Sequence, residues 1–73
     1  MPSPQRQARI YAMREHLSAH ILMLKEELNI FFDHPVGISA NADYFKTIED
    51  KLCELAEYKG MLETIETEFD NGK

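Results

Sequence analysis

The sequence predicts an all-α protein, an antiparallel hairpin of two long helices. Apolar residues recur at intervals of three and four over residues 8–32 and again over residues 42–69, and the alternation expected of a strand fails in both segments. Between them, residues 33–41 hold the helix breakers Pro35 and Gly37. Two helices of similar length joined by so short a segment pack antiparallel, so we expect a single helical-hairpin domain over residues 8–69.

The first predicted helix covers residues 8–32. Its apolar stripe consists of Ile10, Met13, Leu17, Ile21, Leu24, Leu28 and Phe31. The helix is predicted to end before Pro35, because a proline cannot continue the hydrogen-bond ladder and disfavours helical angles at the residue before it. Residues 1–7 contain two prolines and no apolar stripe, and we expect them to be a disordered lead-in.

The second predicted helix covers residues 42–69, with Ser39 or Asn41 as its N-cap and a frayed tail over residues 70–73. Lys59 interrupts the stripe, where its aliphatic stem can lie along the contact, and Gly60 weakens the helix by about 1 kcal/mol relative to alanine. The stripe drifts backwards around the helix, which favours a left-handed supercoil. It consists of Phe45, Ile48, Leu52, Leu55, Leu62, Ile65 and Phe69.

We expect the core of the hairpin to form where the two stripes meet, with the turn at Pro35 and Gly37. The predicted core residues are Ile10, Leu17, Ile21, Leu24, Leu28, Phe31, Phe45, Ile48, Leu52, Leu55, Leu62 and Ile65. The stabilisation from the apolar area buried between two helices is small compared with the conformational entropy cost of folding, about 1.5 kcal/mol per ordered residue. The sequence therefore favours a four-helix bundle made by two chains, with a tetramer as the alternative to a homodimer.

The first helix carries a second, weaker stripe of small and apolar residues, namely Ala12, Ala19, Met23 and Ile30. We interpret this stripe as the self-association surface, since small residues let a neighbouring helix approach closely. The alternative is that these four are ordinary surface residues.

Composition excludes several classes of function. Eight basic and thirteen acidic residues give a net charge of −5, which argues against nucleic acid or an anionic membrane as partner. No run of 18 apolar residues is present, so no membrane span is expected. The lone Cys53 excludes an internal disulfide and a cysteine-based zinc site, and favours the cytoplasm as location.

No pattern of catalytic residues stands out. His16 and His20 lie four apart, as pairs of helical metal ligands do, but the His-Glu-x-x-His motif is absent and further ligands would have to come from another helix. Cys53 has no histidine near it in sequence and is expected to be a half-buried packing residue. Arg6, Arg9 and Arg14 form only a short basic patch. We therefore expect no enzyme, no metal and no cofactor.

Residues 28–38 read LNIFFDHPVGI, followed by Asp43 and an Ile-Glu-x-Lys-Leu helix. This stretch resembles small uncharacterised proteins of marine tailed phages and ocean metagenomes, which are similar to two-helix hairpins with a Phe-Phe-x-x-Pro-Val-Gly-Ile turn. The resemblance implies the same hairpin fold and a phage or environmental origin, with the host cytoplasm as location. It implies no activity.

These observations predict a non-enzymatic, self-associating helical hairpin, a small interaction, assembly or accessory protein. The alternative is a regulator or inhibitor that binds a host or phage protein through one helix face. A metal-binding or catalytic helical bundle is a third possibility, for which the pair His16 and His20 is the only motif.

Overall fold

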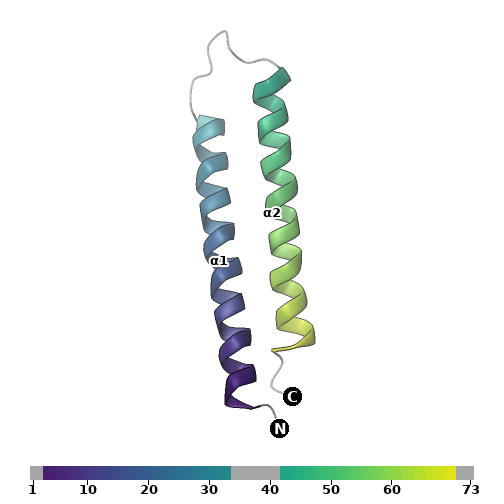
Figure 1. Ribbon diagram of the computed structural model, residues 1–73. Helices are drawn as coiled ribbons and strands as arrows, with labels where there is room; N and C mark the ends of the chain where they lie inside the picture. The colour runs from purple at the N-terminus through teal and green to yellow at the C-terminus, as the bar shows by residue number, and fades with distance from the viewer. Residues whose placement is uncertain (1–2, 34–41, 71–73) are drawn as a thin grey trace.

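A computed structural model describes residues 3–33 and 42–70. Helix α1 spans Pro4–Asp33 and helix α2 spans Ala42–Glu68. The two helices lie side by side in opposite directions over their whole length, so Arg6 near the start of α1 reaches Phe69 just beyond the end of α2 (Figure 1). The predicted all-α antiparallel hairpin is confirmed. No helix within the described ranges is long and apolar enough to cross a membrane.

Helix α1 begins four residues earlier than predicted, and the expectation that residues 4–7 are disordered is wrong. The backbone N–H of Arg6 donates to the Ser3 hydroxyl oxygen at 3.0 Å, and the N–H of Gln7 donates to the Ser3 carbonyl at 3.0 Å. Ser3 is thus a helix N-cap. Pro4 occupies the first helical position, where its missing N–H costs nothing and its fixed φ favours the helix. The capping serine and the proline outweigh the missing apolar stripe.

The hairpin has a thin core along the seam, the line on which α1 and α2 touch. In the described part of the chain four hydrophobic residues are buried, namely Leu17, Leu24, Leu28 and Ile48. Six of the other eight predicted core residues are half-buried, namely Ile10, Ile21, Phe31, Leu55, Leu62 and Ile65. The prediction is wrong for Phe45 and Leu52, which remain 60% and 46% exposed.

The drift of the α2 stripe explains this difference. Phe45 and Ile65 are twenty residues apart, and at about 100° per residue Ile65 lies about 160° behind Phe45 around the helix. A helix lying alongside α1 cannot turn both positions towards it. The middle of the range meets α1, and Phe45 and Leu52, at the leading edge of the drift, stay on one side of the seam.

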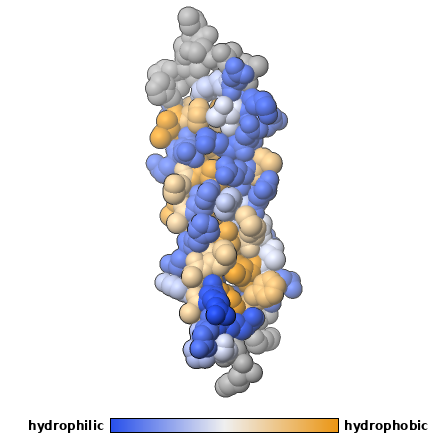
Figure 2. All heavy atoms as spheres, viewed as in Figure 1, coloured by the Kyte–Doolittle hydropathy of each residue, from blue (hydrophilic) through white to orange (hydrophobic). Residues whose placement is uncertain are grey.

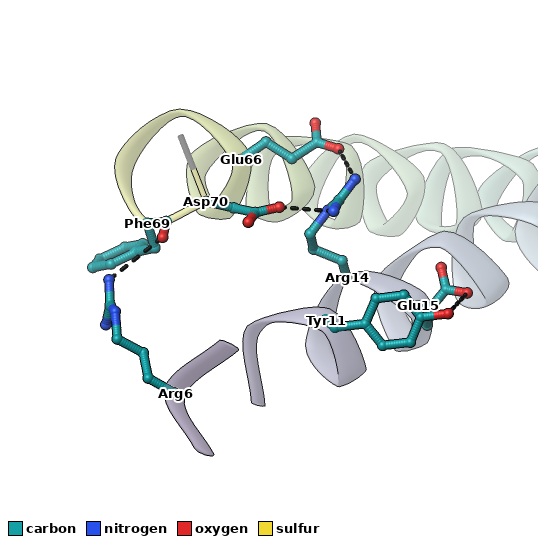
Figure 3. Close-up of polar contacts among 7 residues, drawn as sticks. All are labelled: Arg6, Tyr11, Arg14, Glu15, Glu66, Phe69 and Asp70. Atoms are coloured by element: carbon teal, nitrogen blue, oxygen red, sulfur yellow. Dashed lines mark hydrogen bonds and ion pairs between the residues drawn. The ribbon is translucent and has the colours of Figure 1, made fainter. Parts of the chain in front are cut away.

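Polar contacts across the edges of the seam hold the two helices in register. Arg14 pairs with Glu66 at 3.3 Å and with Asp70 at 2.7 Å (Figure 3), and Lys51 pairs with Glu27 at 3.2 Å. These side chains are partly exposed, and such pairs contribute about 0–1 kcal/mol each. They therefore select the alignment of the helices more than they stabilise the fold.

Aromatic residues close the seam near the C-terminal end of α1. Tyr44 donates a hydrogen bond from its hydroxyl to the Phe31 carbonyl, and the two rings meet edge to face at 5.6 Å. The predicted turn residues Pro35 and Gly37 and the predicted N-caps Ser39 and Asn41 lie outside the described residues.

Candidate functional site

One side of the seam opens into a shallow groove. We call this side of the hairpin the groove face. Ile21 of α1 and Leu52, Leu55 and Leu62 of α2 give it apolar walls, and the small residue Ala56 deepens it. Its volume is about 700 Å³. The groove is continuous with the hairpin core, because the half-buried side chains of Ile21, Leu55 and Leu62 belong to both.

Three large apolar residues stand exposed on the groove face. Phe45 lies seven residues before Leu52 and hence on the same side of α2, because seven residues make about two helical turns. Phe32 lies eleven residues after Ile21, about three turns, and therefore on the same side of α1. Phe32 and Phe45 are each 60% exposed and Leu52 is 46% exposed. The groove is therefore accompanied by apolar side chains that no other part of the described chain covers.

Charge is divided between the two helices on the groove face. From α1 come the cations Arg14 and Lys25, which lie seven residues before and four residues after Ile21. From α2 come the carboxylates of Glu63 and Glu66 at the groove, with Lys59 between the apolar walls. Glu49 lies seven residues before Ala56 and shares its side of α2.

Most of these charges have no partner within the described part of the hairpin. Arg14 and Glu66 pair with each other, whereas Lys25, Glu49, Lys59 and Glu63 take part in no hydrogen bond or ion pair there. Among the described residues, the groove face thus combines exposed apolar area with one unpaired cation on α1, Lys25, and two unpaired carboxylates on α2, Glu49 and Glu63, beside Lys59.

The opposite side of the seam has a smaller apolar pocket of about 290 Å³ near the N-terminal end of α1. Met13 and Leu17 line it from α1, and Met61, Ile65 and Phe69 line it from the α2 side. Met61 and Phe69 are 44% and 51% exposed. In Figure 2, hydrophobic residues reach the surface in separate patches along the hairpin, divided by hydrophilic ones.

The predicted self-association residues lie apart from the groove. Met23 and Ile30 are 63% and 60% exposed, and Ala12 and Ala19 are exposed as well. They share a side of α1 that faces away from α2, because they recur at intervals of seven, four and seven residues, close to whole helical turns, outside the buried stripe. This stripe is an exposed apolar strip that makes no contribution to the core.

The two histidines of α1 face the edge of the seam. Their rings meet edge to face at 6.2 Å, and His20 stacks on Tyr58 with ring centroids 3.9 Å apart. The Nε2 atom of His20 lies 3.5 Å from a Glu54 carboxylate oxygen. Within residues 3–33 and 42–70, no three His, Cys, Asp or Glu side chains are grouped so as to hold a metal ion.

Cys53 is exposed, so its predicted half-buried packing role is wrong. It lies on the side of α2 turned away from α1, where its thiol donates to a Glu57 carboxylate oxygen at 3.6 Å. This hydrogen bond, and then the negative charge of Glu57, raise the pKa of the Cys53 thiol above its usual value. The thiol is therefore less reactive than an ordinary exposed cysteine.

The short basic patch near the start of α1 is largely engaged within the hairpin. The Arg6 guanidinium donates to the Phe69 carbonyl at 3.4 Å, and Arg14 is held by Glu66 and Asp70 (Figure 3). Two of its three arginines thus serve the contact between the helices.

Sequence reasoning missed the groove face because it assigned Phe45 and Leu52 to the hairpin core. The signal was present in the backward drift of the α2 stripe, which moves its first residues out of the seam. Comparison with known proteins adds no further guide: no protein-family model, curated protein or solved structure matches the chain.

Proposed function

We propose that this chain is a non-enzymatic, self-associating module whose hairpins pair into a four-helix bundle, with a homodimer as the functional unit. One observation carries the proposal: among residues 3–33 and 42–70, four hydrophobic residues are buried, whereas ten large ones are between 44% and 63% exposed. Isolated exposed hydrophobic residues are ordinary, but several on one helix face are typical of an interface.

The shape of the hairpin supports the same proposal. Its radius of gyration is 16.7 Å and its extents are 58 × 15 × 13 Å, whereas a compact chain of this length has a radius of gyration of about 11 Å. A two-helix layer buries little apolar area against the entropy of ordering it. A second hairpin would add the missing layer, so folding and association would be linked.

Analytical ultracentrifugation combined with thermal melts tests this proposal. We expect a dimer at micromolar concentration and a melting temperature that rises with protein concentration, because mass action stabilises a folded dimer. A folded monomer at 100 µM, roughly a hundredfold above a micromolar Kd, would contradict the proposal.

A second function is favoured by the exposed strip of Met23 and Ile30. A dimer formed over the seam leaves this strip uncovered, and an amphipathic helix face of this kind suits a partner protein. In that case the chain is a regulator or inhibitor of a host or phage protein, in keeping with the resemblance of its turn region to phage proteins.

Changing Met23 and Ile30 together to glutamate separates the two uses of this strip. Loss of a protein captured from host lysate with an intact dimer would support the regulator. Loss of the dimer would instead make Ala12, Ala19, Met23 and Ile30 the self-association surface.

A further inference from the structure

We propose that the groove face is the dimer interface, and that its two-fold axis runs parallel to the helices, so that the C-terminal ends of both α1 helices lie at the same end of the bundle. This inference rests on the proposed self-association and adds the surface and the symmetry. The occupant of the groove is a second copy of this chain.

The exposed area matches what a second copy would cover. The chain exposes 5754 Å², whereas a compact folded chain of 8.5 kDa exposes about 4,650 Å². The excess, about 1,100 Å², is somewhat larger than the 800 Å² or so that each subunit buries in a standard interface. The groove face is the place for such burial because its walls already belong to the core.

The register of the hairpin fixes which residues lie level with one another. Phe31 lies level with Tyr44, and Glu27 with Lys51, as their contacts demand. Counting along both helices from these pairs places Phe32 level with Phe45 and Lys25 level with Leu52. Closer to the N-terminal end of α1, the same count brings Ile21 level with Ala56, and their shared groove agrees with it.

Two symmetric ways of stacking the groove faces differ in which helices meet. With the two-fold axis parallel to the helices, α1 of one subunit lies on α2 of the other at the same level. Phe32 then packs against Phe45 of the partner subunit, twice in the dimer, and Ile21 against the partner's Ala56. With the axis perpendicular to the helices, α1 lies on α1 and α2 on α2, so these pairs are lost.

Charge selects the parallel axis. The groove side of α1 carries Arg14 and Lys25 and no carboxylate, whereas that of α2 carries Glu49, Glu63 and Glu66 against a single Lys59. Stacking α1 on the α2 of another copy brings cations to carboxylates, with Lys25 one turn from Glu49 of the partner subunit. The perpendicular axis places like charges together, and such contacts are destabilising.

A matched pair of variants tests the surface. Phe45 and Ile30 are both 60% exposed, the first on the groove face and the second on the outer side of α1. We expect Phe45→Glu to weaken dimerisation at least tenfold in sedimentation equilibrium, because a carboxylate would be desolvated in the interface. We expect Ile30→Glu to leave the dimer unchanged.

The outcomes of this test are distinct. A parent dimer that survives Phe45→Glu, or that is lost with Ile30→Glu alone, overturns the groove face but not self-association. A monomeric parent overturns self-association itself. If Phe45→Glu lowers the helix content, Lys25→Glu provides the second variant and should also weaken the dimer. Lys25 is exposed, and its charge pairs with no group among residues 3–33 and 42–70.

Cross-linking tests the symmetry. Ser18 lies three residues before Ile21 and therefore on the same side of α1, and the register places it level with Lys59. We place one cysteine at each position in separate chains, Ser18→Cys and Lys59→Cys, both with Cys53→Ser. One variant carries an affinity tag that distinguishes mixed from like pairs by mass. With a short bismaleimide, we expect cross-linked pairs in the mixture and few in either variant alone. Pairs formed by one variant alone, or none in the mixture, would overturn the parallel axis.

Discussion

The two helices of the hairpin contribute unequally to its core. Helix α1 supplies three of the four buried residues, Leu17, Leu24 and Leu28, whereas α2 supplies Ile48 alone. Both helices have seven apolar residues in their predicted stripes, so the number of apolar residues does not explain the difference. The α1 stripe keeps its phase around the helix and the α2 stripe drifts. The angular position of the apolar residues around a helix, more than their number, decides which of them it can bury against one neighbouring helix.

The apolar residues that α2 cannot bury become surface on both sides of the seam. Phe45 and Leu52, early in the drift, accompany the groove, and Ile65, late in the drift, lines the smaller pocket with Met61. A helix that drifts in this way is suited to contact more than one neighbour, as each helix of a four-helix bundle does.

Shortening one leucine on each helix tests this comparison with the largest expected effect. Leu24 is 2% exposed and Leu52 is 46% exposed. We expect Leu24→Ala to lower the free energy of unfolding by about 2–5 kcal/mol at any protein concentration, as for buried leucines in general. We expect Leu52→Ala to cost about 1 kcal/mol in dilute protein, since only half of a leucine's burial is lost.

Chemical denaturation at low and high protein concentration measures both effects. The cost of Leu52→Ala should grow with concentration, because the dimer buries that side chain, and the cost of Leu24→Ala should not. Equal costs for the two variants in dilute protein would mean that Leu52 belongs to the hairpin core after all.

A smaller effect is expected at Gly60, which lies inside α2. A Cβ added there would meet no atom within 4 Å, so Gly60→Ala should express the full helix propensity difference and stabilise the protein by about 1 kcal/mol. The melting temperature should rise by about 4–8 °C for a domain of this size. The comparison variant Ala56→Gly, one turn earlier, should lower it by at least as much, because Ala56 also lies in the groove that the second copy covers.

If Gly60→Ala stabilises the protein by much less than the propensity difference, the glycine makes a favourable contact that is absent from the single hairpin. Such a result would locate a close contact on α2, and a gain restored in dilute protein would assign that contact to a second chain.

The smallest expected effect concerns Cys53, on the side of α2 turned away from α1. Its pKa is raised chiefly by Glu57, so less thiolate is present at neutral pH than for an ordinary cysteine. Glu57→Gln should lower the pKa of the thiol and speed its alkylation by iodoacetamide, with little change in stability. Glu68→Gln, which removes an acidic charge from the same helix without touching Cys53, should leave the rate unaltered.

Equal alkylation rates for the parent and Glu57→Gln would show that the contact between Cys53 and Glu57 is not kept in solution. Protection of Cys53 at high protein concentration would place this side of α2 in an interface, and would count against the groove face as the contact surface.

The fold was predictable from the sequence because the local spacing of apolar residues is enough to predict both helices. The three-and-four spacing of apolar residues needs no tertiary information, and Pro35 predicts a break between the two helical segments because a proline cannot continue a helix. The start of α1 was also readable, in hindsight, from Ser3 followed by Pro4, a capping residue before a proline. The prediction failed there because it relied on the apolar stripe alone.

The sequence by itself determined that there are two helices, where their stripes lie and how steeply the second stripe drifts. Only the tertiary structure decided which part of that drift meets α1, because the register depends on contacts between residues far apart in the chain, such as Arg14 with Glu66 and Phe31 with Tyr44. That register buried Ile48, left Phe45 and Leu52 exposed, and paired Arg14 of α1 with Glu66 of α2. A stripe on one helix determines only which way its residues face around their own helix axis. A surface shared by two helices exists only once the two axes are aligned.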